Sequence, residues 1–113
     1  MEGMLQPNSL KEKTIIITGG GTGLGRSMGK YFLELGANLV ITSRKKEVID
    51  KTAGELMQET GGKVLAVPCD VRKYEEIENV IAKAEAEFGS VTGVVNNAAG
   101  NFISPTERLS HRA

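Results

Sequence analysis

The sequence predicts an α/β fold in which a doubly wound parallel sheet lies between helices, in three layers α/β/α. Three observations support this prediction. Short apolar runs alternate with longer amphipathic segments, the runs and segments are about 5 and about 12–15 residues long as is usual for strands and helices, and glycine follows each amphipathic segment. A strand–helix alternation of this kind requires right-handed crossovers between parallel strands.

The first strand is predicted at Thr14–Thr18, where every residue is β-branched, as in a strand buried on both faces. The segment after it has apolar residues at helical spacing and ends at Gly36, which indicates a helix with a glycine stop. The apolar positions of this helix are Leu24, Met28, Tyr31, Phe32 and Leu35.

A second buried strand is predicted at Asn38–Thr42, followed by a helix from about Lys46 to Thr60 that ends at Gly61. We expect Ile49, Leu56 and Met57 on the apolar face of this helix.

The third strand is predicted at Lys63–Val67, the third helix at about Tyr74–Phe88 and the fourth strand at Gly93–Asn96. Residues 101–113 form no clear element, so the fold is expected to stop after the fourth strand. We interpret residues 1–113 as the N-terminal half of one domain, either a fragment of a longer product or a unit that another chain completes. The apolar face of the third helix is expected to contain Ile77, Val80, Ile81, Ala84 and Phe88.

Composition narrows the function classes. Fourteen Lys and Arg balance fourteen Asp and Glu, which argues against a nucleic-acid partner, and no apolar stretch is long enough for a membrane span. The first ten residues do not resemble a secretory signal, so we expect a cytoplasmic protein, with a mitochondrial matrix protein after presequence removal as the alternative. The one cysteine, Cys69, is expected to be a small buried residue in a reducing compartment.

A glycine-rich turn joins the first strand to the first helix. Glycines let the backbone approach a pyrophosphate closely, and the helix that begins there directs free N–H groups and a positive dipole end at the anion. Because the turn follows a buried strand and starts a βαβ unit, it predicts a Rossmann-like dinucleotide site, with a merely structural tight turn as the alternative. The candidate cofactor-binding residues are Gly19, Gly20, Gly21, Thr22, Gly23, Leu24 and Gly25.

The end of the second strand indicates which dinucleotide binds. An acidic residue there would accept hydrogen bonds from the ribose 2′-OH of NAD, but this chain has Ser43, Arg44 and Lys45, then Lys46. Cations and a hydroxyl suit a 2′-phosphate, so the predicted cofactor is NADP(H). The alternative is a solvated basic turn at a helix start, although cations there oppose the helix dipole.

Two further segments follow strands. Asp70, with Val71 beside it, comes after the third strand and could accept a hydrogen bond from adenine or cap the third helix. The run Asn96-Asn97-Ala98-Ala99-Gly100 ends the fourth strand, where small residues would let a nicotinamide ribose lie against the backbone; turn chemistry is the alternative. We include Asn97, Ala98, Ala99 and Gly100 in the candidate cofactor site.

These motifs together resemble the short-chain dehydrogenase/reductase family, over the chain from about Leu10 onward. The glycine pattern Thr18-Gly19-x-x-x-Gly23-x-Gly25, Asp70 and the Asn-Asn-Ala-Ala-Gly run occur in the family's order. Within the family, residues 96–110 and the leader at 4–9 are similar to 2,4-dienoyl-CoA reductases.

That resemblance implies NADPH-dependent reduction of a 2,4-dienoyl-CoA in the oxidation of unsaturated fatty acids, by a protein that is a homo-oligomer at full length. It also implies acyl-CoA contacts for Arg44, Arg72, Phe102 and Ser110, with Phe102 as a hydrophobic loop anchor the alternative. It places the pyrophosphate at residues 19–24, the 2′-phosphate at Arg44 and adenine at Asp70.

The family's catalytic Tyr-x-x-x-Lys is missing from these 113 residues. Leu35 stands four residues after Tyr31, and Glu78 stands four residues after Tyr74. His111 lies in a polar stretch that does not suggest an acid or base. We therefore predict no catalytic residue and no metal ligand in the chain, which leaves three functions open: part of a dienoyl-CoA or other short-chain reductase, a non-catalytic dinucleotide-binding module, or a scaffold without nucleotide.

Overall fold

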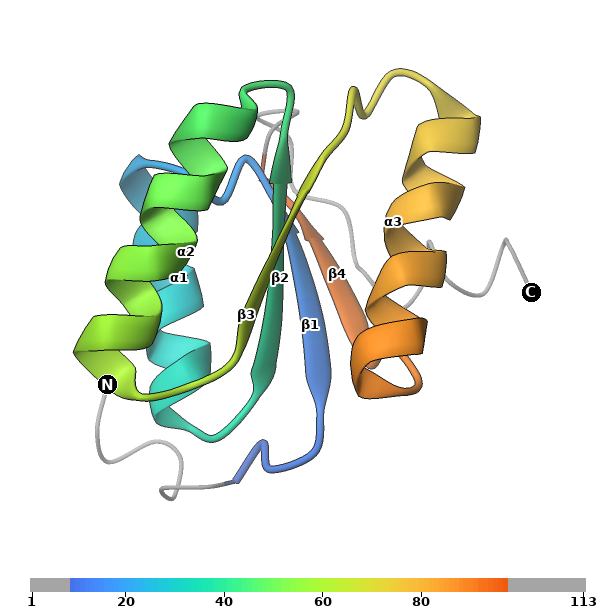
Figure 1. Ribbon diagram of the computed structural model, residues 1–113. Coiled ribbons are helices and arrows are strands. Elements are labelled where there is room, and N and C mark those ends of the chain that lie inside the picture. The colour runs from blue at the N-terminus through green and yellow to red at the C-terminus, as the bar shows by residue number, and fades with distance from the viewer. Residues whose placement is uncertain (1–8, 98–113) are drawn as a thin grey trace.

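A computed structural model describes residues 9–97, which form four parallel strands and three helices (Figure 1). The strands form one sheet in the order β3-β2-β1-β4. The elements are β1 Thr14–Thr18, α1 Gly23–Glu34, β2 Asn38–Ser43, α2 Lys46–Thr60, β3 Val64–Pro68, α3 Tyr74–Phe88 and β4 Gly93–Asn96. The predicted fold class is confirmed, since the described strands are all parallel and helices lie on both faces of the sheet.

The two faces of the sheet bury alternate residues of each strand, as the pleat requires. Helices α1 and α2 cover one face and α3 covers the other (Figure 1). The first face presents Ile15, Ile17, Leu39 and Ile41, and the second presents Ile16, Val40 and Val67. Every residue of β1 is buried, which confirms the prediction of a strand covered on both sides.

The chain changes face at β1. Helices α1 and α2 follow β1 and β2 on one face, whereas the connection from β3 crosses over to the other side of β1 and returns through α3 to β4. The strand order therefore reverses between β1 and β4. In open parallel sheets, ligands bind beyond the carboxyl ends of the strands at this point of reversal.

Two residues predicted at the apolar positions of helices are exposed, and this part of the prediction is wrong. Leu24, in the first turn of α1, is 68% exposed. The buried residues of α1 are Gly25, Gly29 and Leu33, and Met28 and Phe32 of the predicted apolar face pack partly buried against the same core. A Cβ on Gly29 would lie 2.8 Å from Leu39 Cδ2, so this glycine lets the helix lie close to β2.

Met57 of α2 is 41% exposed, although its neighbour Leu56 is fully buried. Consecutive helical residues point about 100° apart, and here Leu56 points into the core while Met57 points toward solvent. Thr52 and Ala53, which the apolar pattern did not single out, are buried with Ile49 and Leu56.

The element boundaries agree closely with the predictions, apart from two strands: β2 ends at Ser43 rather than Thr42, and β3 is shifted by one residue. β3 begins at Val64 rather than Lys63 and includes Pro68 as its last residue. Proline is tolerated there because β3 is an edge strand of the described sheet and Pro68 is exposed. The predicted glycine stops are confirmed at Gly61 and Gly89, with φ of 74° and 90°.

Candidate functional site

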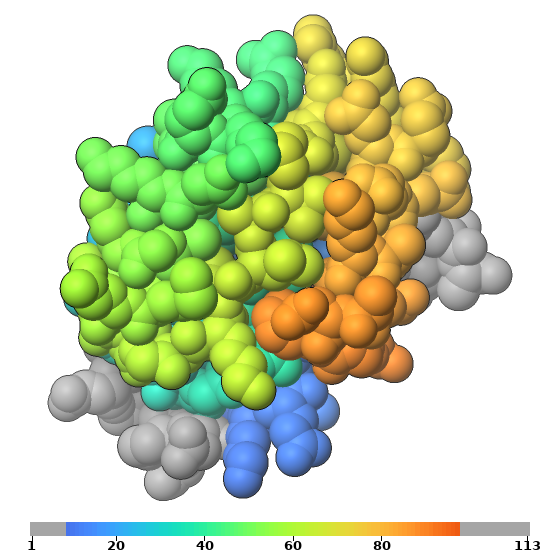
Figure 2. Space-filling view, in the orientation of Figure 1, coloured from blue at the N-terminus to red at the C-terminus, as the bar shows by residue number. Residues whose placement is uncertain are grey.

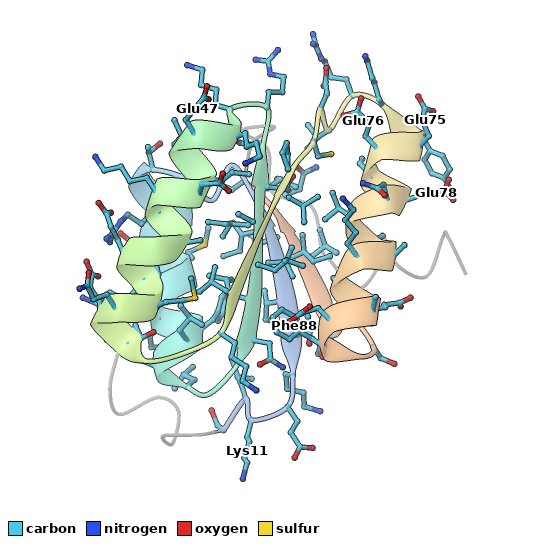
Figure 3. All side chains as sticks on the ribbon, in the orientation of Figure 1. Lys11, Glu47, Glu75, Glu76, Glu78 and Phe88 are labelled. Atoms are coloured by element: carbon cyan, nitrogen blue, oxygen red, sulfur yellow. The ribbon has the colours of Figure 1, made fainter. Side chains whose placement is uncertain are left out.

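The carboxyl ends of all four strands lie at one edge of the sheet, where the predicted site residues gather. In Figure 2, the green surface at the end of β2 and the start of α2 lies beside the yellow surface at the end of β3. Figure 3 shows Glu47 at the start of α2 and Glu75 and Glu76 at the start of α3 on this same edge, whereas Lys11 lies at the opposite end of the molecule.

The first part of the glycine-rich turn is buried and the second part is exposed. A Cβ on Gly20 would lie 2.6 Å from Ile41 Cγ2, and a Cβ on Gly21 would lie 2.7 Å from Val48 Cγ1. Both positions are buried, so these two glycines are needed for packing against β2 and α2. The turn then emerges, because Thr22, Gly23 and Leu24 are exposed.

Two other glycines of the turn meet different requirements. A Cβ on Gly25 would collide with the carbonyl oxygen of Gly19, so this position must be glycine for the turn to close. Gly23 has a φ of 57° and nothing within 4 Å of its would-be Cβ. The exposed part of the turn is thus a backbone surface without side-chain cover at Gly23, where a ligand could approach closely.

The start of α1 differs from the starts of the other two helices in residues 9–97. Its first turn contains no acidic residue, whereas the lack of a side-chain capping hydrogen bond at its N-cap, Thr22, is shared by the N-caps of α2 and α3. The first turns of α2 and α3 contain Glu47, and Glu75 and Glu76, respectively (Figure 3). Carboxylates stabilise the positive end of a helix dipole, so α1 is the helix whose N-terminus is left for an external anion.

The end of β4 is hydrogen-bonded to this turn. The Thr18 hydroxyl donates to Asn96 Oδ1 at 3.0 Å, and Asn97 Nδ2 donates to the Gly19 carbonyl at 3.2 Å. The two asparagines therefore join β4 to β1 and the turn, which neither alternative from the sequence described. The remaining predicted residues of this segment, Ala98, Ala99 and Gly100, lie outside the described residues.

The end of β2 presents exposed cations. Ser43 Oγ accepts a hydrogen bond from the Lys45 N–H at 3.1 Å, which shapes the turn into α2. Arg44 and Lys45 are exposed. Lys46 Nζ lies 2.6 Å from Asp50 Oδ2 within α2, and this hydrogen bond raises the pKa of Lys46.

At the end of β3, Asp70 is paired with Arg72. Asp70 Oδ1 accepts from the Arg72 N–H and Nε, both at 3.0 Å, and Oδ2 accepts from Arg72 Nη2 at 2.9 Å. The side-chain and backbone hydrogen bonds from Arg72 hold the pKa of Asp70 below its usual range, and the charge of Arg44 acts in the same direction. Asp70 is thus a carboxylate of fixed orientation at the predicted adenine position.

The alternative in which Asp70 caps the third helix is wrong. Helix α3 starts at Tyr74 and its N-cap is Lys73, three residues beyond Asp70. The carboxylate of Asp70 instead accepts hydrogen bonds from Arg72. Glu76 of α3 accepts a hydrogen bond from the Asp70 N–H at 2.8 Å. Arg72, which the family resemblance placed near the acyl-CoA, is an exposed residue on the same edge of the sheet.

Cys69 is buried, as predicted, and burial raises the pKa of its thiol. The residue lines a small cavity of about 20 Å³ between the sheet and α3, together with Thr18, Thr42 and Val71. The rest of the lining is aliphatic. Because Thr18, Thr42 and Cys69 line it, the cavity lies close to the carboxyl ends of β1, β2 and β3.

Sequence reasoning missed one buried contact of the turn. Thr52 of α2 donates a 2.6 Å hydrogen bond to the Gly21 carbonyl and is 4% exposed. The spacing of Thr52, three residues after Ile49, could have predicted that it lies on the buried face of the helix. It could not have predicted its partner, Gly21, which lies 31 residues away in the sequence.

In the part of the chain that the structure describes, no group of three or more His, Cys, Asp and Glu side chains is placed to hold a metal ion. Within the same part, every helix is too short or too polar to span a membrane. Phe102, Ser110 and His111 lie outside the described residues.

A family model described as short chain dehydrogenase matches residues 13–113. The chain belongs to the short-chain dehydrogenase family. The resemblance inferred from the glycine-rich turn, Asp70 and the asparagine run is therefore confirmed at the level of the family.

Relatives in this family include named reductases. The chain is 41% identical over 110 residues to an uncharacterized oxidoreductase of Caenorhabditis elegans and 40% identical over 111 residues to a protein of that organism named "Probable 2,4-dienoyl-CoA reductase 3". It is 36% identical over 107 residues to the peroxisomal 2,4-dienoyl-CoA reductase of Mus musculus. The matches cover 96%, 97% and 95% of this chain but only 35%, 36% and 37% of those proteins.

Solved structures show the same fold. A citronellol catabolism dehydrogenase of Pseudomonas aeruginosa matches with a TM-score of 0.76 and 39% identity, over 82% of this chain and 38% of that one. The L-sorbose reductase of Gluconobacter frateurii, described in complex with NADPH and L-sorbose, matches with a TM-score of 0.76 and 28% identity, over 81% of this chain and 35% of that one.

Proposed function

We propose that this chain binds NADP(H) along the carboxyl edge of its sheet, as the cofactor-binding part of a short-chain reductase that acts on 2,4-dienoyl-CoA. One observation carries the proposal: Thr22 and Gly23 are exposed at the start of α1, whose first turn has no acidic residue, and they lie on the same edge as the cations of the β2–α2 turn. A pyrophosphate would bind at the helix start, against residues 19–25.

The charges at the end of β2 support NADP(H) over NAD(H). Arg44 and Lys45 are exposed there, whereas a carboxylate, which would bind a ribose 2′-OH, first occurs at Glu47 in the first turn of α2. Since Lys46 is paired with Asp50, we assign the 2′-phosphate to Arg44 and Lys45 together with Ser43. The NADPH complex of the L-sorbose reductase is consistent with this choice.

We assign adenine to Asp70 and Val71, and the nicotinamide ribose to the segment from Asn97 to Gly100. The Asp70 carboxylate is an acceptor, which matches the donor character of the adenine amino group. The Asn97 hydrogen bond to Gly19 keeps the start of the ribose segment against the pyrophosphate turn.

Bound NADPH would supply a hydride to the substrate. The residues of this chain bind and orient the cofactor, and no proton-transfer step is assigned to them because the 113 residues contain no Tyr-x-x-x-Lys. The dienoyl-CoA assignment is supported by the names of two of the relatives described above. In this proposal Arg44 and Arg72 bind the CoA phosphates, and Phe102 and Ser110 contact the acyl chain.

The cofactor proposal is tested by titrating the purified chain with NADPH and with NADH, following nucleotide fluorescence. We expect NADPH to bind roughly tenfold more tightly than NADH, because one charge-assisted contact to the extra phosphate contributes about that factor. Circular dichroism on the same sample shows whether the chain is folded. A folded chain that binds neither nucleotide at millimolar concentration would refute the proposal and favour a scaffold without nucleotide.

The substrate proposal needs a separate measurement. Calorimetric titration of the NADPH-loaded chain with a 2,4-dienoyl-CoA and with free CoA is expected to show binding of both, weakened in Arg72→Gln. Binding of NADPH without any binding of the CoA compounds would leave the cofactor proposal intact and remove the substrate from it.

A further inference from the structure

We propose that Thr52 is a positioning residue for the cofactor: its hydroxyl fixes the Gly21–Thr22 peptide and so presents the exposed part of the glycine-rich turn to the pyrophosphate. The inference rests on the proposed NADP(H) site and extends it to a residue of α2 that lies outside every motif in the sequence. Thr52 touches neither cofactor nor substrate in this proposal and acts through the backbone of the turn.

The contact between Thr52 and the turn is short and shielded from water. Thr52 Oγ1 donates to the Gly21 carbonyl oxygen at 2.6 Å, and Thr52 is 4% exposed. Without this donor, a carbonyl in a buried turn would lose its partner, which is costly in an apolar interior. Among described residues, this is the side-chain hydrogen bond that ties α2 to the backbone of the turn.

Packing from the same helix restrains the same residue. Val48 lies one helical turn before Thr52 and would be 2.7 Å from a Cβ on Gly21, and Ile49 would be 3.5 Å away. Gly21 therefore packs closely against Val48 of α2, and the Thr52 hydrogen bond holds its carbonyl in place. Arg26, on α1 just beyond the turn, pairs with Glu55 and Glu59 of α2 at 3.2 and 2.8 Å, so α2 is also joined to the helix that follows the turn.

The direction of the Gly21 carbonyl determines where the next N–H group, that of Thr22, points. In a trans peptide the C=O of one residue and the N–H of the next point in opposite directions. The Gly21 carbonyl points at α2, so the Thr22 N–H points away from α2, at the position where the turn becomes exposed. Losing the Thr52 hydroxyl would let this peptide rotate and would withdraw a donor from the anion site.

The experiment compares Thr52→Val, Thr52→Ser and Thr60→Val with the unmodified chain. Valine keeps the shape of threonine without the hydroxyl, and serine keeps the hydroxyl. Thr60 is the matched control, since its hydroxyl donates to the Leu56 carbonyl at 2.8 Å within α2, at the end of the helix far from the turn. NADPH affinity, thermal unfolding and amide hydrogen exchange of residues 21–23 are measured for each chain.

We expect Thr52→Val to weaken NADPH about tenfold and to speed exchange at residues 21–23, whereas Thr52→Ser stays within about threefold of the unmodified chain. Thr60→Val is expected to lower the unfolding temperature without changing affinity or exchange in the turn. Unchanged affinity and exchange in Thr52→Val, or an equal loss of affinity in Thr60→Val, would overturn the inference. Failure of the unmodified, folded chain to bind NADPH would instead refute the proposed function, and exchange in the turn would still show whether Thr52 holds it.

Discussion

Arg72 encloses the carboxylate of Asp70, donating two side-chain hydrogen bonds at 3.0 and 2.9 Å and one backbone hydrogen bond at 3.0 Å. The pair lies at the carboxyl end of β3, where the proposed adenine position is. Because all three donors favour the ionised carboxyl, the pair fixes both the charge and the direction of an acceptor at the site.

The first prediction concerns the pH dependence of this pair. The pKa of folded Asp70 is lowered, so its contribution to stability is fully present above the ordinary aspartate pKa of about 3.9 and is lost as the pH falls through the lowered value. Arg72→Gln should return the pKa of Asp70 toward the ordinary value, as measured by NMR titration of the side-chain carboxyl carbon. An Asp70 that titrates alike in both chains would show that Arg72 does not set its pKa.

The second prediction concerns the 2′-phosphate. Arg44→Ala should weaken NADPH about tenfold and change NADH less than about threefold, because the two nucleotides differ only by the phosphate that Arg44 is proposed to contact. Fluorescence titration measures both affinities. Lys63→Ala, at an exposed cation before β3 on the opposite edge of the sheet, is the control for net charge and should change neither affinity. Equal weakening of NADPH and NADH by Arg44→Ala would contradict the phosphate assignment.

The third prediction separates the roles of three glycines. Gly25→Ala should lower the free energy of unfolding by about 2–3 kcal/mol, because the new Cβ collides with the Gly19 carbonyl and lies 2.9 Å from Asn97 Nδ2. Gly23→Ala should cost about 1–2 kcal/mol from its φ of 57° alone, since nothing lies within 4 Å of the new Cβ. Gly54→Ala, at an exposed position inside α2 with similar space, should stabilise by about 0.5–1 kcal/mol.

Denaturant unfolding of the three glycine variants measures these changes. The order Gly54→Ala, Gly23→Ala, Gly25→Ala, from most to least stable, follows from the geometry of the backbone and of its neighbours. If Gly23→Ala proved as destabilising as Gly25→Ala, the turn would be more tightly enclosed at Gly23 than the structure shows.

The fourth prediction concerns the thiol of Cys69. The residue is 3% exposed and burial raises its pKa, so the folded chain should react with an aromatic disulfide reagent roughly a hundredfold more slowly than the unfolded chain. The double variant Cys69→Ser, Ser90→Cys carries its thiol at an exposed position and should react rapidly when folded. Rapid reaction of Cys69 in a chain that is folded by circular dichroism would contradict its burial.

The repeating pattern of the chain was sufficient to predict the sheet. β1 is β-branched throughout, and the structure buries all five of its residues. The ranges Lys46–Thr60, Tyr74–Phe88 and Gly93–Asn96 were predicted from apolar spacing and glycine stops, and they are the observed bounds of α2, α3 and β4. Local signals suffice here because period and punctuation are properties of neighbouring residues.

Residues whose role depends on distant partners were predicted less well. Leu24 and Met57 are apolar, as core residues usually are, but whether each is buried depends on how its helix packs on the sheet. Asp70 was left between an adenine acceptor and a helix cap; the structure rejects the cap because α3 starts later and because Arg72 binds the carboxylate. Neither fact follows from the spacing of apolar residues.

The candidate site shows the same division. The sequence by itself determined which residues end the strands, namely the glycine-rich turn, the cations after β2, Asp70 and the asparagine pair, because these are local features of a βαβ pattern. Only the tertiary structure decided that Gly20 and Gly21 serve packing while Gly23 stays open, that Asn97 joins β4 to Gly19, and that Thr52 holds the turn from α2. The reason is physical: close contacts, and hydrogen bonds across 31 and 78 residues, depend on how helices and strands pack, which no local pattern in the sequence specifies.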